Sequence, residues 1–572
     1  MVSKVQSSPA IATRTTGRSN SALFTRREWL YVGVFILFIL MLTALPYVFA
    51  YRSAPPDRQF MGIMVNIPDH FQYLSWMREA QTRVLVPNQM TPEDSMPLLF
   101  NFLWWTLGRI EALTGLDYAT LYQITRLLAG GFVMAATYFF CGVVFRNRTK
   151  RWIAFLIGSL GGGLGWIWVI EKYLTGNEIP LDKSFTLFTS EPNTFFNVLA
   201  FPHFSIAAGL IAVVFGLVLL GQRSQNLRYA WLAAAVSLLL SVQHAYDMFI
   251  IYPVIGLFAL FVWMRDRRFP LYLFKLGVIV VLVSMWPALQ AFLITTVDPV
   301  MRGVLAQFDN AGAFTPAPYY LPFLMGLSWL LAIWALDIRT PLKDRDDTHL
   351  FVVAWFLAHF VLVYLPMDFQ IHMLSGWQIV AGVLATIGLY TRVLPLLRRF
   401  FKNRSQTQLI RISASVLLLA IIPVNLYLFA WRFIDLRRAE APFYMPTDTI
   451  AAYDYLETQV QSDDVVLSSL TVGQFVPALT GARAYLAHWA QTLDFFTKRD
   501  NVAAFFGTEL TDAQREAILQ EFGVDYIIYT PEEQALGDFN LDDAPYLEAV
   551  FNSGDATVYA VTLDTVALAA SD

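Results

Sequence analysis

Long apolar runs recur from Trp29 to Trp431, and they constrain the fold of this chain more than any other feature of its sequence. A helix needs about 20 mostly apolar residues to cross the hydrocarbon core of a bilayer. Eleven runs approach that length: 29–51, 121–145, 152–170, 199–220, 229–244, 248–264, 271–293, 319–336, 350–365, 374–394 and 409–431. The sequence therefore predicts a polytopic α-helical membrane protein with about eleven spans, the first of them a retained anchor.

Composition supports this class and excludes others. Of 572 residues, 56% are hydrophobic and 15% are charged, against about 25% charged in soluble domains. These values exclude a disordered, collagen-like or ordinary cytosolic protein. The single cysteine, Cys141, excludes an intrachain disulfide and a Cys-x-x-Cys metal site. The apolar stretch 98–113 carries Arg109 and Glu111, so we expect an interfacial or re-entrant helix there, with a twelfth span left open.

Basic residues predict the orientation. They gather before the first span and in every second loop after it: Arg14, Arg18, Arg26 and Arg27; Arg146, Arg148, Lys150 and Arg151; Arg223 and Arg228; Arg265, Arg267 and Arg268; Arg339, Lys343 and Arg345; and Arg392, Arg398, Arg399, Lys402, Arg404 and Arg411. Such loops face the cytoplasm. We therefore expect a disordered cytoplasmic tail (1–28), a plasma-membrane domain (29–436) with a large first external loop (52–120), and an extracytoplasmic module (437–572).

The C-terminal module is acidic. From Glu440 onward there are 22 acidic and four basic residues, which argues against a nucleic-acid partner because phosphates are repelled. Strand patterns at 465–467, 484–486, 524–529 and 557–561 alternate with helical patterns at 447–460, 493–506 and 511–522, which predicts a small α/β fold. His488 and Trp489 are candidates for acceptor recognition, although turn chemistry favours a purely structural role for this region.

The first external loop contains an amphipathic helical pattern. In the segment NIPDHFQYLSWMREAQ, residues Phe71, Leu74, Met77 and Ala80 recur at helical spacing. We expect this helix to lie along the membrane surface. Asp69 follows a proline at the helix start, where a carboxylate either caps the helix or performs chemistry.

Other polar residues fall in predicted external connections and converge on the same face. They are His203, His244, Asp247, Gln370 and His372. In one common cleft they would bind an anionic head group or a divalent ion such as Mg²⁺ or Mn²⁺. The alternatives are hydrated interfacial histidines and a helix cap at Asp247. No tight ligand spacing is present, so a metal requirement stays open.

The membrane interior argues against an ion-coupled transporter. His359 is the one ionisable side chain that we expect near mid-membrane, whereas such transporters use buried acidic or basic residues there. The glycine cluster 158–165 lies within an apolar run and lacks a following Lys-Ser/Thr, so it predicts close helix packing and not a phosphate loop.

Several features of the first 170 residues occur in the same order in one membrane enzyme family. They are Asp69 with Tyr73 four residues later and Ala80 beyond; Pro97-Leu98-Leu99-Phe100; the turn Leu113-Thr114-Gly115; Arg126 at the second span; and the basic loop 146–151. This pattern resembles the GT-C integral-membrane glycosyltransferases, in particular the protein mannosyltransferase and aminoarabinose transferase branch. The family commonly has a second acid where this chain has His70.

The resemblance implies a cell-envelope glycosyltransferase that uses a polyprenyl-phosphate sugar, with Asp69 as the base and Arg126 near the lipid phosphate. Tyr73 and Arg78 join the candidate substrate-binding residues. The acceptor is a glycan, a lipid or a protein. Two alternatives remain: a transporter of lipid-linked glycan or polysaccharide, and a noncatalytic scaffold, which the replacement of the usual acid by His70 motivates.

Overall fold

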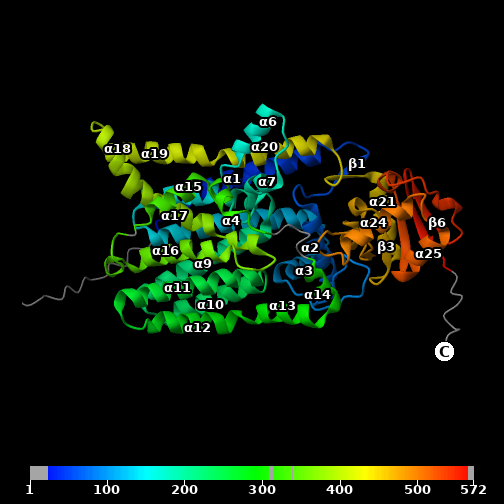
Figure 1. Ribbon diagram of the computed structural model, residues 1–572, viewed down its shortest axis with the longest axis horizontal. Helices are drawn as coiled ribbons and strands as arrows, with labels where there is room; N and C mark the ends of the chain where they lie inside the picture. The colour runs from blue at the N-terminus through cyan, green and yellow to red at the C-terminus, as the bar shows by residue number, and fades with distance from the viewer. Residues whose placement is uncertain (1–23, 308–313, 338, 564–572) are drawn as a thin grey trace, which may run out of the picture.

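The computed structural model describes residues 24–307, 314–337 and 339–563. It has an elongated helical bundle with a sheet-containing module packed against one end (Figure 1). The bundle helices are α1 (Arg26–Ser53), α4 (Tyr118–Val144), α5 (Arg148–Leu160), α6 (Trp166–Thr175), α7 (Leu181–Phe188), α8 (Thr194–Ala200), α9 (Pro202–Ser224), α10 (Leu227–Ser241), α11 (Met248–Asp266), α12 (Leu271–Ser284), α13 (Trp286–Val297), α15 (Leu321–Ala335), α16 (Asp347–Leu362), α17 (Trp377–Gly388), α18 (Leu394–Phe400), α19 (Gln406–Ile421) and α20 (Pro423–Arg438).

Each expected apolar run falls on one or two of these helices, which confirms the polytopic helical class. Seven helices of the described ranges are long and apolar enough to span a membrane, and an eighth is obtained if α12 and α13, bent by 44°, form one span. The helices α10 and α16 are apolar but shorter. The first helix begins at Arg26, three residues before the expected run, and most of the predicted tail lies outside the described residues.

The predicted span 152–170 is wrong as a single helix. It breaks after α5, and residues 161–165 of the glycine cluster form a loop between α5 and α6, whereas Gly158 lies within α5. There Leu164 donates its N–H to the carbonyl of Phe323 at 2.5 Å, and a Cβ on Gly163 would lie 2.1 Å from the same oxygen. The glycines therefore allow backbone-to-backbone packing, as expected, but through a loop.

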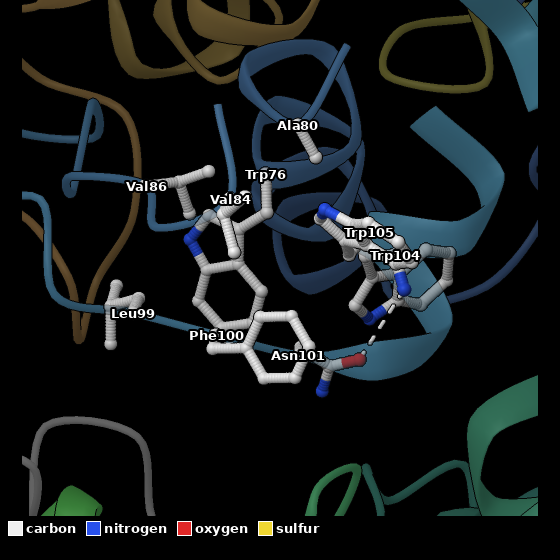
Figure 2. Close-up of a pocket in the computed structure, with 9 residues that line it drawn as sticks. All are labelled: Trp76, Ala80, Val84, Val86, Leu99, Phe100, Asn101, Trp104 and Trp105. Carbon is white, nitrogen blue, oxygen red and sulfur yellow. Dashed lines mark hydrogen bonds between the residues drawn. The ribbon is translucent and has the colours of Figure 1, made fainter. Parts of the chain in front are cut away.

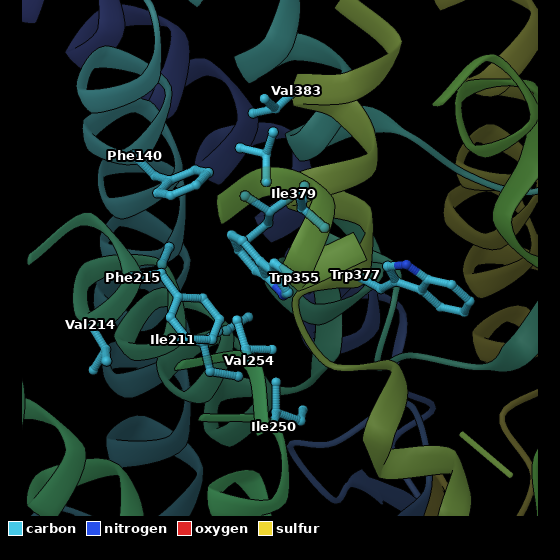
Figure 3. Packing of buried hydrophobic residues seen from close by; sticks show 14 of the residues in the cluster. Phe140, Ile211, Val214, Phe215, Ile250, Val254, Trp355, Trp377, Ile379 and Val383 are labelled. Atoms are coloured by element: carbon cyan, nitrogen blue, oxygen red, sulfur yellow. The ribbon is translucent and has the colours of Figure 1, made fainter. Parts of the chain in front are cut away.

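Aromatic side chains fill the middle of the bundle. The ring of Trp355 lies 5.1 Å from that of Phe140 and 4.6 Å from that of Phe215, and all three are buried (Figure 3). His359 accepts from the Trp355 indole N–H at 3.0 Å through Nε2, and its Nδ1 lies 2.6 Å from the Met373 carbonyl. Both ring nitrogens thus have partners, and His359 is a neutral structural histidine.

Loops with basic clusters meet at the end of the bundle opposite the module (Figure 1). We call this the basic end; it comprises residues 144–151, 223–228, 265–271, 339–349 and 392–406. Arg223 donates to Thr348 at 2.7 Å, and Arg265 pairs with Asp347 at 2.6 Å. Three expected cytoplasmic loops contribute to these two contacts, so they share one end. The other end is the module end.

The C-terminal module contains a five-stranded mixed sheet in the order β4-β3-β5-β7-β6. The strands are β3 (Val465–Leu467), β4 (Arg483–Ala484), β5 (Val524–Tyr529), β6 (Leu547–Ser553) and β7 (Ala556–Val561). β3 pairs in parallel with β4 and β5, whereas β7 runs antiparallel to β5 and β6. Helices α21 (Thr447–Gln459), α24 (Phe495–Phe506) and α25 (Asp512–Glu521) accompany it. The α/β prediction is confirmed; strand β6 was not expected.

The first external loop is tied to the module. Strand β1 (Arg58–Phe60) pairs antiparallel with β2 (Tyr444–Pro446), which follows α20. The expected amphipathic helix is α2 (Ile67–Glu79), and α3 (Phe102–Thr114) follows it. The expectation that the apolar face of α2 lies on the membrane is wrong. Phe71 packs on Phe475 of the module with ring centres 4.4 Å apart. Packing against protein removes an apolar helix face from water just as insertion into lipid would.

Candidate active site

The site is built around Asp69 in the first turn of α2. His488 of the module lies 2.8 Å away, Nε2 to Oδ1, and the Asn66 side-chain amide donates to Oδ2. Since His488 Nδ1 accepts the backbone N–H of Ala490 at 3.0 Å, the ring proton is on Nε2 and points at Asp69. Both carboxylate oxygens therefore accept from side chains, one in each part of the molecule, and neither acts as a simple helix cap.

The surroundings of Asp69 keep it ionised. Burial alone would raise the pKa of this carboxyl, but the hydrogen bond and charge of His488, with smaller effects of His70 and Asn66, lower the pKa below its usual 3.8. The side chain retains 31% exposure. Asp69 is thus a permanently charged carboxylate that a substrate can reach.

His70, next to Asp69, faces the protein interior. Its Nδ1 lies 2.9 Å from the Asn66 carbonyl, and its Nε2 lies 3.3 Å from the hydroxyl of Tyr122 on α4. Burial lowers the pKa of His70, so the ring is neutral near neutral pH. The residue that replaces the family's usual acid therefore orients the start of α2 and carries no negative charge.

Four histidines form a continuous series, which we call the histidine row: His70, His203, His244 and His372. The ring of His203 lies 5.8 Å from that of His70 and 5.5 Å from that of His244. Tyr246 continues the series, with its ring 4.9 Å from His244 and stacked 4.6 Å from His372. The structure thus brings together the three histidines that the sequence analysis placed in one cleft, and adds His70.

Two more carboxylates border the row. Glu191, before α8, lies 2.8 Å from Nδ1 of His372. Asp247, at the start of α11, is fully buried, and its Oδ2 lies 3.4 Å from Nδ1 of His244. The sequence analysis named Asp247 but did not assign Glu191 to the site. The polar run Ser190-Glu191-Pro192-Asn193 between apolar helices was the signal that pointed to it.

Tyr73 stands one turn after Asp69 and borders the row as expected. Its ring stacks on Trp104 of α3 at 5.2 Å and meets the edge of His203 at 5.0 Å. Burial, with the charges of Asp69 and Glu191, raises the pKa of the Tyr73 hydroxyl, so it stays protonated and is able to donate a hydrogen bond to a ligand.

Three other candidates are held by protein groups. Arg126 is buried one turn below the row on α4; it donates to a backbone carbonyl at 3.2 Å and lies 4.5 Å over the ring of Tyr47. Arg78 pairs with Glu457 of the module at 3.0 Å, so it joins two parts of the protein and does not face the row. Gln370 donates to a backbone carbonyl at 2.9 Å. Their expected substrate contacts stay predictions.

Comparison with known proteins identifies the fold. No model of a known protein family and no curated protein sequence matches the chain. Solved structures do match the chain. Oligosaccharyltransferase AglB from Archaeoglobus fulgidus, with an inhibitory peptide and dolichol phosphate, is 13% identical and matches over 94% of this chain and 75% of that one, with a TM-score of 0.52. ArnT from Cupriavidus metallidurans, bound to undecaprenyl phosphate, is 12% identical over 95% of this chain and 99% of that one (TM-score 0.50), and mycobacterial arabinofuranosyltransferase AftD is 14% identical over 95% of this chain and 42% of that one (TM-score 0.54).

The chain has the GT-C fold. The expected fold class is therefore confirmed across nearly the whole chain, well beyond the first 170 residues that carried the resemblance. At 12–14% identity the likeness extends to the fold alone. The chemistry must be argued from the side chains of this chain.

Two hollows lie in the region of α2 and the module. One is an aromatic cavity of about 120 Å³ behind the stack of Tyr73 on Trp104, where the rings of Trp76, Phe100 and Trp104 are grouped (Figure 2). Its lining comprises Trp76, Ala80, Val84, Val86, Leu99, Phe100, Asn101, Trp104 and Trp105. This lining suits an apolar chain or ring.

The other hollow is a polar cleft of about 470 Å³ between the bundle and the module. Pro68 and Trp489, the neighbours of Asp69 and His488 in sequence, both line it. The two module residues expected to recognise an acceptor thus have different positions: His488 contacts Asp69, and Trp489 contributes to the cleft wall.

The metal expectation finds no built site. Among the described residues, no group of three or more His, Cys, Asp or Glu side chains is arranged to hold a metal ion. The donor types of the histidine row suit a divalent ion, but its first three ring centres are 5.5–5.8 Å apart. We therefore derive no chemical step through a metal.

Proposed function

We propose that this protein is a membrane glycosyltransferase that moves a sugar from a polyprenyl-phosphate donor to an acceptor at the module end, which faces the extracytoplasmic side. One observation carries the proposal: in a GT-C fold, an ionised and partly exposed Asp69 is held by hydrogen bonds from both the bundle and the module.

The chemistry follows from this carboxylate. An acceptor O–H or N–H gives its proton to Asp69 while the acceptor atom forms a bond to C1 of the sugar. The bond from C1 to the phosphate oxygen breaks, and the lipid phosphate leaves with the electron pair. Asp69 is a weak base because its pKa is low. A phosphate is a good leaving group, however, so proton transfer is required only as C1 becomes electrophilic. His488 and Asn66 fix the direction of the carboxylate.

The histidine row and the cleft at Trp489 suit the two substrates. The donor phosphate lies along the histidine row, against Tyr73, His203, His244 and His372, and its lipid chain extends towards apolar surface. The acceptor enters from water through the polar cleft at Trp489. AglB and ArnT were solved with dolichol phosphate and undecaprenyl phosphate respectively, which supports the choice of a polyprenyl phosphate as the donor's carrier.

A donor panel tests the proposal. Purified protein in bilayer discs is incubated with radiolabelled polyprenyl-phosphate sugars and a mixture of glycan, lipid and peptide acceptors. We expect label in a product with a new glycosidic bond. Movement of lipid-linked glycan across vesicles without new bonds identifies a transporter. Partner pull-down with no label transfer from any donor identifies a scaffold. Either result contradicts the proposal.

A further inference from the structure

The proposed donor site must hold an anion, yet three carboxylates border it. Asp69, Glu191 and Asp247 all lie at the histidine row. Six basic side chains at the module end are already engaged by protein groups: Arg58, Arg78, Arg126, Arg432, Arg483 and Lys498. Where dielectric screening is weak, an anion beside three carboxylates needs a compensating positive charge.

Two buried polar groups at the row lack hydrogen-bond partners within the described residues. His203 is 3% exposed, and its Nδ1 has no hydrogen-bond partner within the described part of the chain. Asp247 is 0% exposed, and neither of its oxygens accepts a hydrogen bond there. Buried groups of this kind are costly unless a proton or a ligand satisfies them. Both groups adjoin His244, so they mark one place in the row.

We propose that the histidine row binds the donor phosphate together with a proton, so that the pair of His203 and His244 supplies the positive charge that the bound phosphate requires. This proposal rests on the proposed function and specifies how its donor site works. Histidine is the side chain whose charge changes most readily near neutral pH, and a phosphate anion bound beside the ring favours its charged form. Donor affinity then rises as the pH falls.

Each element packed around His203 contributes titratable groups that set this balance. They are His70 and Tyr73 from α2; His244, Tyr246 and Asp247 from the start of α11; His372 from the turn Gln370–Leu374; and Glu191 from the segment before α8. Asp247 lies 3.4 Å from His244, and Glu191 lies 2.8 Å from His372. The phosphate adds a further negative charge and favours protonation of His203.

A non-titrating ligand tests the inference. The methyl ester of a polyprenyl phosphate carries one fixed negative charge between pH 5.5 and 8.5, so pH dependence of its binding belongs to the protein. Binding to the full chain in bilayer discs is measured by calorimetry, with and without EDTA, in two buffers of different ionisation enthalpy. We expect about one proton taken up, and a Kd that rises by up to about tenfold per pH unit between pH 5.5 and 8.5. EDTA should change nothing.

Variants assign the proton. His203→Gln and His244→Gln should each weaken binding at pH 6 about tenfold or more and flatten its pH dependence. His349→Gln is the matched control, because His349 contacts Arg345 at the basic end, and this variant should bind like the wild type. Thermal unfolding of each variant separates loss of the site from loss of the fold.

Three results overturn the inference: a Kd that does not change with pH, binding that EDTA abolishes and Mn²⁺ restores, and no binding at any pH. The assay contains no sugar and no acceptor, so it is independent of transfer. Proton-linked binding without transfer from any donor would refute the transferase and leave the lipid-phosphate site. Sugar transfer by a protein whose phosphate binding does not depend on pH would refute the proton-linked role of the histidine row and leave the proposed transferase intact.

Discussion

The two ends of the bundle hold their buried charges in opposite ways. At the basic end, Arg151 pairs with Glu28 at 3.0 Å, and these side chains are only 8% and 5% exposed. Tyr138 also donates to the Glu28 carboxylate, at 2.5 Å. At the module end, Asp247 is at least as deeply buried but has no hydrogen bond within the described residues, and His203 has a free ring nitrogen.

This difference separates structure from function. A buried ion pair with complete hydrogen bonding fixes how loops pack, and its removal damages the fold. Buried polar groups without partners contribute nothing comparable to stability and await a ligand or a proton. The contrast assigns loop assembly to the basic end and substrate binding to the module end. Each assignment can be tested by a separate variant.

The largest stability effect is expected at the basic end. Glu28→Gln leaves the buried Arg151 without its counter-charge, so unfolding should become easier by about 3–5 kcal/mol. Denaturant unfolding in mixed micelles measures this loss. Transfer by the protein that remains folded should be unchanged. A selective loss of activity with normal stability would contradict the division between the ends.

Next in size is the link between the module and Asp69. His488→Ala should lower kcat about 10–100-fold with little change in KM, because Asp69 loses its orientation. His488→Gln, which retains an N–H donor, should recover most of the rate. If the Ala and Gln variants are equally slow, His488 does not act through this hydrogen bond.

The pH profile sharpens this prediction. In the wild type the pKa of Asp69 lies below 3.8, so the carboxylate is ionised at any higher pH and imposes no acid limb between pH 5 and 8. Without the His488 donor, burial dominates and raises this pKa. Activity of the Ala variant should therefore fall at a higher pH than that of the wild type as the solution is acidified, whereas a purely structural role would lower the rate equally at every pH.

A smaller stability effect is expected at the row. Asp247→Asn removes a buried charge that lacks hydrogen bonds, so stability should change by less than about 1 kcal/mol or increase. Binding of the phosphate methyl ester should weaken instead, since His244 loses the carboxylate that lies 3.4 Å from its ring. A loss of several kcal/mol, measured as for Glu28→Gln, would show that Asp247 is a structural residue.

The smallest effect is expected where α2 meets the module surface. Arg78 and Glu457 pair at 3.0 Å with side chains 27% and 49% exposed. Such pairs contribute about 0–1 kcal/mol. Glu457→Gln should therefore leave both the unfolding midpoint and transfer nearly unchanged. A large loss would mean that this contact, and not the buried Phe71–Phe475 packing, holds α2 in place.

Local pattern predicted much of this architecture. Apolar runs located the bundle helices, and alternating patterns located β3, β5 and β7, since both signals lie within short stretches of chain. The convergence of His203, His244 and His372 followed from helix order and the alternation of loops. The break at Gly161–Gly165 could not be predicted in this way, because it depends on a close approach to the Phe323 backbone, which is distant in the sequence.

The contact between Asp69 and His488 could not be predicted from sequence patterns. Asp69 and His488 are separated by 419 residues, and no local signal joins them. For the same reason, the pairing of β1 with β2 and the cover over Phe71 were missed. Glu191 lies in a polar stretch between apolar helices, but only the packing of His372 against it gives it a place in the site.

The central claim is that Asp69 takes the acceptor's proton in a glycosyl transfer, and single-turnover transfer of radiolabelled sugar tests it most directly. Asp57→Asn, which neutralises an exposed carboxylate of the same external loop, is the control. The account predicts that Asp69→Asn slows transfer by about 10²–10⁴-fold while binding of the phosphate methyl ester and the unfolding temperature persist, and that Asp57→Asn matches the wild type. Wild-type turnover by the Asp69→Asn protein would contradict it.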